Sequence, residues 1–457
     1  MIAAKFLIWF LRFTGSGGTT LPGRLAAKIY PGILLRLSGK LNVILITGTN
    51  GKTTTGRIIS RILEINDIPH LQNRSGANLK SGITTAFIEA ASIRGNFSCI
   101  MAVIESDEAA FKTVAPLLSP KVIVVTNFFR DQLDRYGELL TTVQNVKTGI
   151  SQCPNAVLVL NADDSLSSYI GREVPNKVIY YGIDGYNSSR SSADIAGADA
   201  SNCIYCTEKY QYSARTYGHL GHFFCPGCGF KRPEASVACI GVNRLSLSGS
   251  DVALRFDEYE VNNSHSVQIN LPGLYNVYNA LAASACAKAL GVPTGTIIDA
   301  LGTFECGFGR MEIIEHEGRH IRLILIKNPT GFNQVIDYLF SEKKKMVIAF
   351  FINDNDADGT DISWLWDVDI ELFRDLRNLV VRFYCGGIRA EDMAVRLKYA
   401  GIDPGLIFIE KNMKTIIEDS IRLLSEDETL FVLPTYTAML EVRKLLGTEF
   451  NLKEFWK

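Results

Sequence analysis

One short stretch, residues 47–54 (Thr-Gly-Thr-Asn-Gly-Lys-Thr-Thr), constrains this 457-residue chain more than any other. The apolar run before it, residues 42–47, is typical of a buried strand, and residues 53–65 after it are typical of a helix. A strand that leads through a glycine turn into a helix points backbone N–H groups at one spot, and the helix dipole favours an anion there. The stretch therefore predicts a phosphate-binding loop.

The residue types in this loop indicate which phosphate compound it holds. Gly48 and Gly51 allow a tight turn, Lys52 can reach outer phosphates, and the Thr53 hydroxyl can ligate Mg²⁺. Only two residues separate the glycines, where the generic phosphate loop has four. We predict ATP as the cofactor, bound by Thr49, Asn50, Gly51, Lys52, Thr53 and Thr54.

Further apolar runs predict the fold class, an α/β protein with a parallel sheet covered by helices on both faces. Runs at 99–104, 122–126 and 156–160 alternate with helix-like stretches. A chain of this length favours more than one core, and the alternation restarts after Arg310. The later runs are 321–326, 346–352, 380–384 and 429–433. We expect an ATP-binding domain over residues 1–310 and a Rossmann-like α/β domain over residues 311–457.

Composition excludes several classes of partner. The formal net charge is -1, which gives no general attraction to nucleic acid. No apolar run reaches the roughly 18 residues expected of a membrane span. The apolar segment 2–13 is interpreted as an amphipathic helix packed on the first domain, and weak contact of Trp9 with a membrane surface is the alternative.

Two Cys-x-x-Cys pairs interrupt the α/β pattern within residues 186–233. Eighteen residues separate the pairs, a spacing that closes a tetrahedral thiolate site around Zn²⁺. Four protein ligands leave no open position, so the predicted zinc ribbon is structural. His219 and His222 are spare ligand candidates, and a nucleic-acid ribbon is disfavoured because basic residues are sparse. The predicted ligands are Cys203, Cys206, Cys225 and Cys228.

The shortened glycine loop resembles the ATP loop of the Mur ligase superfamily, and other segments agree in order. These are Glu105, Thr126 to Tyr136 (similar to a T-N-x-x-x-D-H-x-D pattern), Asn161 to Asp164, the G-x-x-N-x-x-N pattern that ends at Asn279, and Gly309 to Glu312. The resemblance implies that Glu105 and Thr53 bind magnesium. It also implies that Asn276 and Asn279 lie near the adenine, and that Arg310 belongs to the hinge into the second domain.

Three positions bear on how far the resemblance extends. Gln132 replaces the superfamily's metal-binding histidine, which puts a second metal site in doubt. The loop starts within fifty residues of Met1, so we expect no separate nucleotide-sugar domain before it. Lys147 stands about where relatives carry a carbamylated, metal-binding lysine, and a solvated helix lysine is the alternative.

A zinc ribbon inside a short ligase core, followed by the acidic segment 353–369, resembles one branch of the superfamily. That branch amidates the D-glutamate α-carboxylate of lipid II, using ammonia from a class I glutamine amidotransferase of the GatD type. The resemblance implies a cytoplasmic heterodimer that acts in peptidoglycan biosynthesis, with a peripheral position at the inner membrane face as the alternative. It further implies that one aspartate completes the partner's Cys–His pair, and the candidates are Asp367, Asp361 and Asp356.

Other interpretations of these segments remain open. Residues 354–359 begin like a calcium loop, but Leu365 occupies the twelfth position, where a bidentate glutamate is required. A solvated acidic loop is the simpler alternative. A ligase that adds an amino acid, similar to folylpolyglutamate synthase, is disfavoured because residues 328–331 lack the D-x-A-H-N-P pattern. A non-catalytic ATP-binding scaffold for an amidase is the other alternative.

Overall fold

The computed structural model describes most of the chain, in two compact units. The described residues are 1–13, 20–73, 76–130, 139–186, 199–246, 249–256, 264–304 and 310–450, with the backbone alone for 12, 13, 310 and 311. The first unit comprises residues 1–129 and 138–304, and the second comprises 130–137 and 305–457. The expected boundary at Arg310 stays a prediction.

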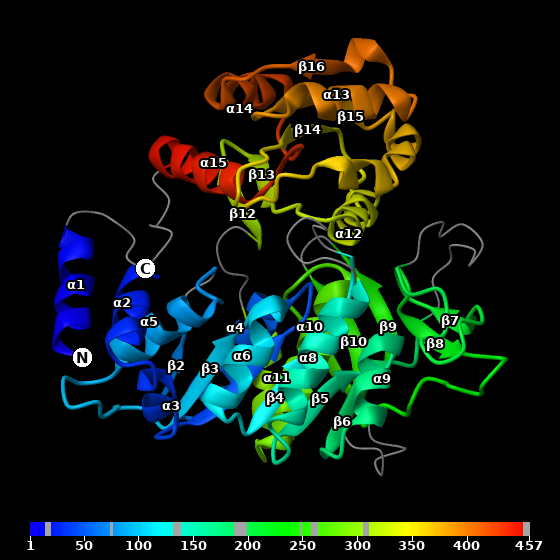
Figure 1. Cartoon of the computed structure of the whole chain (residues 1–457). Coiled ribbons are helices and arrows are strands. Elements are labelled where there is room, and N and C mark those ends of the chain that lie inside the picture. The colour runs from blue at the N-terminus through cyan, green and yellow to red at the C-terminus, as the bar shows by residue number, and fades with distance from the viewer. Residues whose placement is uncertain are drawn as a thin grey trace. The chain divides into compact units, whose positions relative to one another are not determined.

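A nine-stranded sheet forms the first unit, and Figure 1 shows its helices. In spatial order the strands are β11 (His265–Ile269), β10 (Ser250–Arg255), β9 (Val237–Leu245), β6 (Val178–Ile183), β5 (Val157–Asn161), β4 (Val122–Val125), β1 (Asn42–Thr47), β3 (Met101–Glu105) and β2 (His70–Gln72). In this order, neighbouring strands from β9 to β2 are parallel, whereas β10 is antiparallel to both β9 and β11. The predicted α/β class is confirmed, with an antiparallel extension that the sequence did not reveal.

The helices of this unit lie in the connections between strands and in an N-terminal group. They are α1 (Ile2–Phe13), α2 (Leu21–Ile29), α3 (Ile33–Ser38), α4 (Lys52–Ile65), α5 (Lys80–Ala90), α6 (Glu108–Leu118), α8 (Leu139–Ser151), α9 (Ser165–Glu173), α10 (Leu274–Ala289) and α11 (Thr294–Thr303). The predicted zinc module lies between β6 and β9, and its described part, from residue 199 onward, holds the hairpin β7 (Gln211–Arg215) and β8 (Gly221–Phe224).

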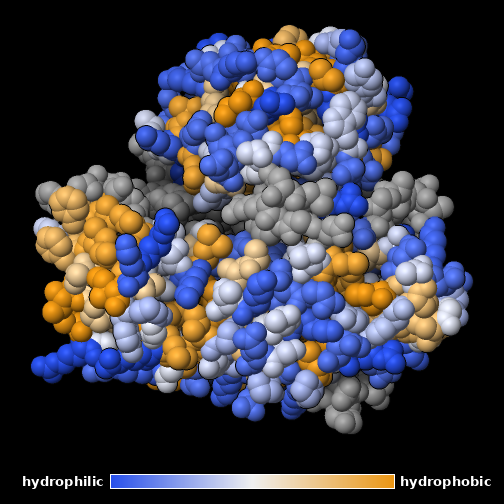
Figure 2. Space-filling model, viewed as in Figure 1, coloured by the Kyte–Doolittle hydropathy of each residue, from blue (hydrophilic) through white to orange (hydrophobic). Residues whose placement is uncertain are grey.

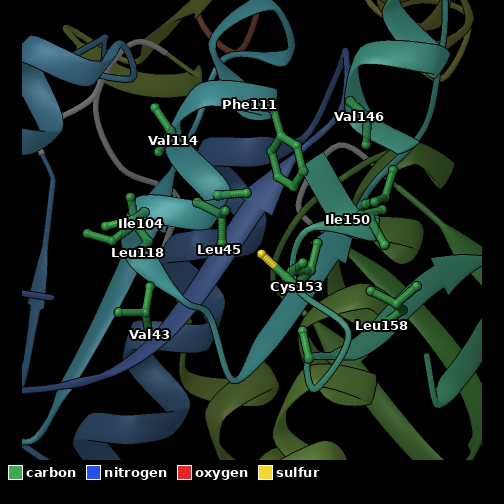
Figure 3. Packing of buried hydrophobic residues seen from close by; sticks show 14 of the residues in the cluster. Val43, Leu45, Ile104, Phe111, Val114, Leu118, Val146, Ile150, Cys153 and Leu158 are labelled. Atoms are coloured by element: carbon green, nitrogen blue, oxygen red, sulfur yellow. The ribbon is translucent and has the colours of Figure 1, made fainter. Parts of the chain in front are cut away.

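Strand β1 is buried on both faces, which explains its unbroken apolar sequence. Val43 and Leu45 face α6 and α8, where they join Phe111 in one core cluster (Figure 3). Ile46 faces α4 instead, since its Cδ1 lies 3.3 Å from the position of a Cβ on Gly56. Each such fully buried side chain contributes roughly 1.5–3 kcal/mol. Burial of this strand fixes the loop that follows it.

The parallel strands place several polar segments at one edge of the sheet. Strands β1, β3, β4 and β5 run in one direction, so their carboxyl ends lie side by side. Ligands bind at this edge in open α/β sheets. The segments that follow Thr47, Glu105, Val125 and Asn161 therefore meet there.

A six-stranded sheet forms the second unit, with the order β12-β13-β17-β14-β15-β16. Only β12 is antiparallel to its neighbour. The strands are β12 (Arg310–His316), β13 (Arg319–Ile324), β14 (Met346–Phe351), β15 (Val380–Gly386), β16 (Ile407–Ile409) and β17 (Thr429–Pro434). The helices are α12 (Pro329–Leu339), α13 (Ala390–Tyr399), α14 (Met413–Leu423) and α15 (Tyr436–Glu449), and the 3-10 turns are η1 (Ser363–Asp367), η2 (Ile370–Leu376) and η3 (Pro404–Leu406). This second α/β sheet matches the prediction.

Candidate functional site

The predicted phosphate loop joins β1 to α4 as a tight turn that only glycine can make. Gly48 and Gly51 have φ angles of 119° and 88°, in a region that favours glycine. A Cβ on Gly51 would lie 2.0 Å from Asn279 Oδ1, and one on Gly48 would lie 2.3 Å from Thr126 Oγ1. Both glycines are therefore required by conformation and by close approach of neighbouring segments.

Residues 127–129 hold the loop in place. The N–H of Thr49 donates to the Asn127 carbonyl (2.9 Å), and the N–H of Asn50 donates to Asn127 Oδ1 (3.0 Å). The Asn127 amide returns a hydrogen bond to the Asn50 carbonyl (3.2 Å). Thr49 Oγ1 accepts from the N–H of Phe129 at 3.1 Å. The Thr-Asn-Phe-Phe segment thus preorganises the loop, a role for Asn127 that sequence reasoning did not assign.

Lys52 is buried and forms an ion pair with Glu108 (Nζ to Oε2, 3.0 Å). Its ammonium also donates to the carbonyls of Gly48 and Thr49, so it lies across the turn. Burial lowers the pKa of Lys52, but the carboxylates of Glu108, Glu105 and Asp107 outweigh burial and raise that pKa above its ordinary value. A fixed positive charge therefore stands beside the loop. Glu108 belongs to no sequence motif that predicts this role.

The two proposed magnesium ligands lie together. Thr53 Oγ1 donates to Glu105 Oε2 at 2.7 Å. The Asn73 side chain fixes the backbone of Glu105, because it accepts from the Glu105 N–H (2.8 Å) and donates to the Glu105 carbonyl (2.9 Å). A hydroxyl and a carboxylate next to a phosphate loop suit Mg²⁺, which prefers oxygen ligands. The residues present fit the ion that the sequence predicts.

The G-x-x-N-x-x-N motif meets the phosphate loop from α10. Both asparagines are buried, and Asn279 Nδ2 donates to Asn276 Oδ1 at 3.0 Å. Asn276 Nδ2 in turn donates to the carbonyl of Pro272 (2.7 Å). Since the Asn279 amide lies against Gly51, this motif and the loop form one site. Arg310 begins β12, and its side chain lies outside the described residues, as does Gln132.

Lys147 lies on α8 and contacts α9. Its ammonium donates to the Tyr169 hydroxyl (2.8 Å) and pairs with Glu173 Oε2 (3.6 Å). The hydrogen bond to Tyr169 outweighs partial burial and raises the pKa of Lys147. A raised pKa favours the ammonium, which does not react with carbon dioxide. Carbamylation of Lys147 stays a prediction.

The four predicted zinc ligands converge. Their Sγ atoms all lie within 4.8 Å of one another, with Cys203 to Cys228 at 3.5 Å and Cys206 to Cys225 at 3.4 Å. Zn–S bonds of about 2.3 Å in a tetrahedron place sulfurs about 3.8 Å apart, so the cluster fits a structural zinc ion. The two histidines of the module have other partners: His219 Nε2 contacts Asp164, and His222 Nε2 contacts the Ile183 carbonyl.

Asp164 connects the cysteine module to the segment that holds the phosphate loop. This fully buried carboxylate caps α9 and accepts from the N–H of Phe128 (2.9 Å). His219 Nε2 lies 3.2 Å from its Oδ1. The Phe129 ring packs on the His219 ring with centroids 4.7 Å apart and on the Tyr217 ring at 5.9 Å. Residues 216–219 therefore pack against the segment that holds the phosphate loop.

Asp163 connects the cysteine module to α10. It is also fully buried, and it accepts from the Tyr278 hydroxyl (2.6 Å) on α10 and from the guanidinium of Arg232 in the cysteine module. Thr216 Oγ1 lies 2.9 Å from the same Tyr278 hydroxyl. The N-x-D-D pattern marks both aspartates in the sequence. No sequence pattern identifies His219, Arg232 and Tyr278 as the partners of these aspartates.

In the second unit, the acidic segment after β14 has a buried part and an exposed part. Asp358 is buried and accepts from the N–H of Thr437 (2.7 Å), so its role is structural. Asp361 Oδ1 accepts from the N–H of Ser363 (2.8 Å) at the start of η1. Asp356 and Asp367 are exposed. All three candidate carboxylates belong to this one segment.

A domain-family model and solved structures show which class of protein this chain resembles. Residues 46–223 match the model of the Mur ligase middle domain. The fold is similar to MurF from Thermotoga maritima in complex with ADP (TM-score 0.63, 14% identity, 94% of this chain and 84% of that one). It is also similar to a pseudomurein peptide ligase type C from Methanothermus fervidus (TM-score 0.64, 22% identity, 90% and 79%). The chain therefore carries an ATP-binding domain of the Mur ligase type.

The family within this class follows from closer relatives. Residues 325–439 match the model of the MurT ligase C-terminal domain. The chain is 34% identical to the MurT subunit of a glutamine-hydrolysing lipid II isoglutaminyl synthase from Streptococcus pneumoniae, over 94% of this chain and 93% of that protein. Its identity to the Staphylococcus aureus (strain COL) subunit is 32%, over 96% and 95%. The chain belongs to the MurT family of ligase subunits.

Proposed function

We propose that this chain is the subunit that amidates lipid II, converting the α-carboxylate of its D-glutamate to D-isoglutamine at the expense of ATP. The observation that carries the proposal is the union in one chain of a Mur-type ATP site with a MurT C-terminal domain. The relatives over nearly the whole length are named as subunits of a glutamine-hydrolysing lipid II isoglutaminyl synthase. A carboxylate is a poor electrophile at neutral pH, so ATP must activate it.

The proposed reaction has two steps. A carboxylate oxygen attacks the γ-phosphorus of ATP, which forms an acyl phosphate and releases ADP. Ammonia then attacks the acyl carbon, loses a proton, and expels inorganic phosphate. The loop N–H groups and the Lys52 ammonium stabilise the transferring phosphoryl group, and Thr53 and Glu105 would hold the Mg²⁺ that neutralises its charge.

We also propose the partner and the remaining site roles. A GatD-like class I glutamine amidotransferase would supply the ammonia, and one carboxylate among Asp367, Asp361 and Asp356 would orient the histidine of its Cys–His pair. The four cysteines would hold a structural Zn²⁺. Because lipid II is membrane-bound, we place the complex at the inner face of the membrane. We also propose that the boundary between the two domains lies at Arg310.

Reconstitution with free ammonia tests the proposed function. The full-length chain, lipid II, ATP, Mg²⁺ and ammonium chloride should yield amidated lipid II together with ADP and phosphate in equal amounts. The Glu105→Ala variant should lose this activity by about 100-fold or more, because transition-state charge is left uncompensated. A chain that binds ATP yet never amidates lipid II contradicts the proposal, and full complex activity of the Glu105→Ala variant would instead identify a scaffold.

A further inference from the structure

Helix α1 buries one face and exposes another that is strongly apolar. Ala4 and Ile8 are 3% and 7% exposed and join the core of the first unit. Opposite them, at helical spacing, lie Ile2, Phe6, Trp9 and Phe10, which are 71%, 63%, 60% and 48% exposed. The rings of Phe6 and Trp9 contact each other, with centroids 5.8 Å apart. A contiguous exposed apolar surface of this kind marks an interaction site.

The helices α2 and α3, which follow α1 in the chain, also expose apolar side chains. Ile29, Tyr30 and Leu35, on and after α2 and on α3, are also exposed. Figure 2 shows hydrophobic colouring over the part of the molecule where Figure 1 draws α1 and α2. We call the exposed residues of α1, α2 and α3 the N-terminal surface.

Charge identifies what covers the N-terminal surface. Residues 1–63 contain no aspartate or glutamate, and Arg24, Lys28 and Arg36 on α2 and α3 are exposed. Helix α5, against which α1 and α2 pack, carries a single acidic residue, Glu89, and Lys5 Nζ donates to its backbone carbonyl (3.2 Å). Aromatic and aliphatic side chains bordered by cations, with anions nearly absent, complement a surface of anionic lipid.

The dimensions of α1 decide how it meets that surface. Twelve residues rise about 18 Å, whereas the hydrocarbon core of a bilayer is about 30 Å thick. None of the helices that the structure describes is long and apolar enough to cross a membrane. We propose that the N-terminal surface lies in the plane of an anionic membrane, with Phe6 and Trp9 inserted among the headgroups and the basic residues on lipid phosphates. This inference deepens the proposed function, on which it rests, because a membrane-bound substrate is then met at the same surface.

Vesicle flotation of the full-length chain tests the inference. The chain should float with phosphatidylglycerol vesicles, bind phosphatidylcholine vesicles more weakly, and lose binding to phosphatidylglycerol as salt rises. Phe6→Ser/Trp9→Ser and, separately, Arg24→Glu/Lys28→Glu should each weaken binding to phosphatidylglycerol by at least about tenfold. Val395→Ser/Tyr399→Ser changes an exposed apolar pair on α13, 45% and 75% exposed, and should bind like the unaltered chain.

Three outcomes overturn the inference: no flotation with phosphatidylglycerol, equal flotation of the Phe6→Ser/Trp9→Ser variant, or a dimer in solution that this variant dissolves without any vesicle binding. The proposed function is measured separately, as amidation of a short-chain, water-soluble lipid II analogue. The N-terminal variants should amidate that analogue normally. Amidation without vesicle binding contradicts only the membrane inference, and vesicle binding without amidation contradicts only the proposed function.

Discussion

At the scale of single residues, the ion pair between Lys52 and Glu108 should link the proposed catalytic role of Lys52 to stability. Both side chains are buried, at 10% and 4% exposure, so neither charge can turn to water if the other is removed. The raised pKa of Lys52 means that the folded state holds its proton more tightly than the unfolded chain does. The resulting stabilisation is present at every pH below the ordinary lysine value of 10.5 and is lost as pH rises through the higher folded pKa.

We predict that Lys52→Met abolishes amidation and also lowers the free energy of unfolding by about 3 kcal/mol, because the Glu108 carboxylate stays buried without its partner. The double variant Lys52→Met/Glu108→Gln should regain most of that stability and none of the activity. Urea unfolding followed by circular dichroism gives the stabilities. If the double variant is no more stable than Lys52→Met, the ion pair does not explain the loss.

The sequence predicts those site residues that belong to short motifs, and it misses those whose roles depend on long-range contacts. Thr53 and Glu105 were expected to act together, and the structure places their side chains 2.7 Å apart. Glu108 and Asn127 were missed as functional residues, because their roles depend on contacts across 56 and 77 positions of the chain. A motif shows which residues stand close in sequence, whereas these pairs exist only after the sheet has formed.

At the scale of secondary-structure elements, buried parallel strands were predicted well and amphipathic ones were missed. The expected strand at 42–47 is β1 as observed, and that at 156–160 is β5 at 157–161, because long apolar runs between helical stretches have few alternatives. The antiparallel strand β10 was not predicted. Its burial alternates residue by residue from Ser250 to Arg255, a period-two signal that is weak in a short, polar segment.

The cysteine module contacts the segment that holds the proposed ATP loop, so changes in the module should affect ATP binding. His219 Nε2 contacts Asp164, and Asp164 accepts a hydrogen bond from the N–H of Phe128. The N–H of Phe129 donates to Thr49 Oγ1 in the loop. His219→Ala should weaken ATP binding by about three- to tenfold, the range expected of indirect coupling. Removal of zinc by a chelator should weaken ATP binding in the same direction. Isothermal titration with ATP measures both effects.

Two further variants show whether the effect passes through Asp164. His219→Gln keeps a donor for this carboxylate and should restore most of the ATP affinity. His222→Ala changes a histidine of the same module whose partners are the Ile183 carbonyl and Asp184, so its ATP affinity should be unchanged. Equal ATP affinity of His219→Ala and the unaltered chain would contradict the supporting role.

At the scale of the whole molecule, the proposed contact with a partner subunit falls on the acidic segment of the second unit. Its acidic segment exposes Asp356 and Asp367, and Asp361 is partly exposed, while the neighbouring Trp366 is 54% exposed. Exposed aromatic residues beside carboxylates suit a protein interface. Asp358, by contrast, is buried and accepts from the N–H and the hydroxyl of Thr437. The segment thus separates a structural carboxylate from candidates for contact with the partner.

The source of nitrogen distinguishes the roles of these carboxylates. If one aspartate completes the partner's Cys–His pair, its change to asparagine should abolish amidation with glutamine and leave amidation with free ammonia intact, because only glutamine hydrolysis needs that carboxylate. We expect this for one of Asp367→Asn, Asp361→Asn and Asp356→Asn in the reconstituted complex. Asp358→Asn should instead reduce both reactions and the unfolding temperature together, since it weakens a buried hydrogen bond. Asp375→Asn, at an exposed position on η2, serves as the unaffected control. If all three candidate variants retain full glutamine-dependent activity, the aspartate that serves the partner does not lie in this segment.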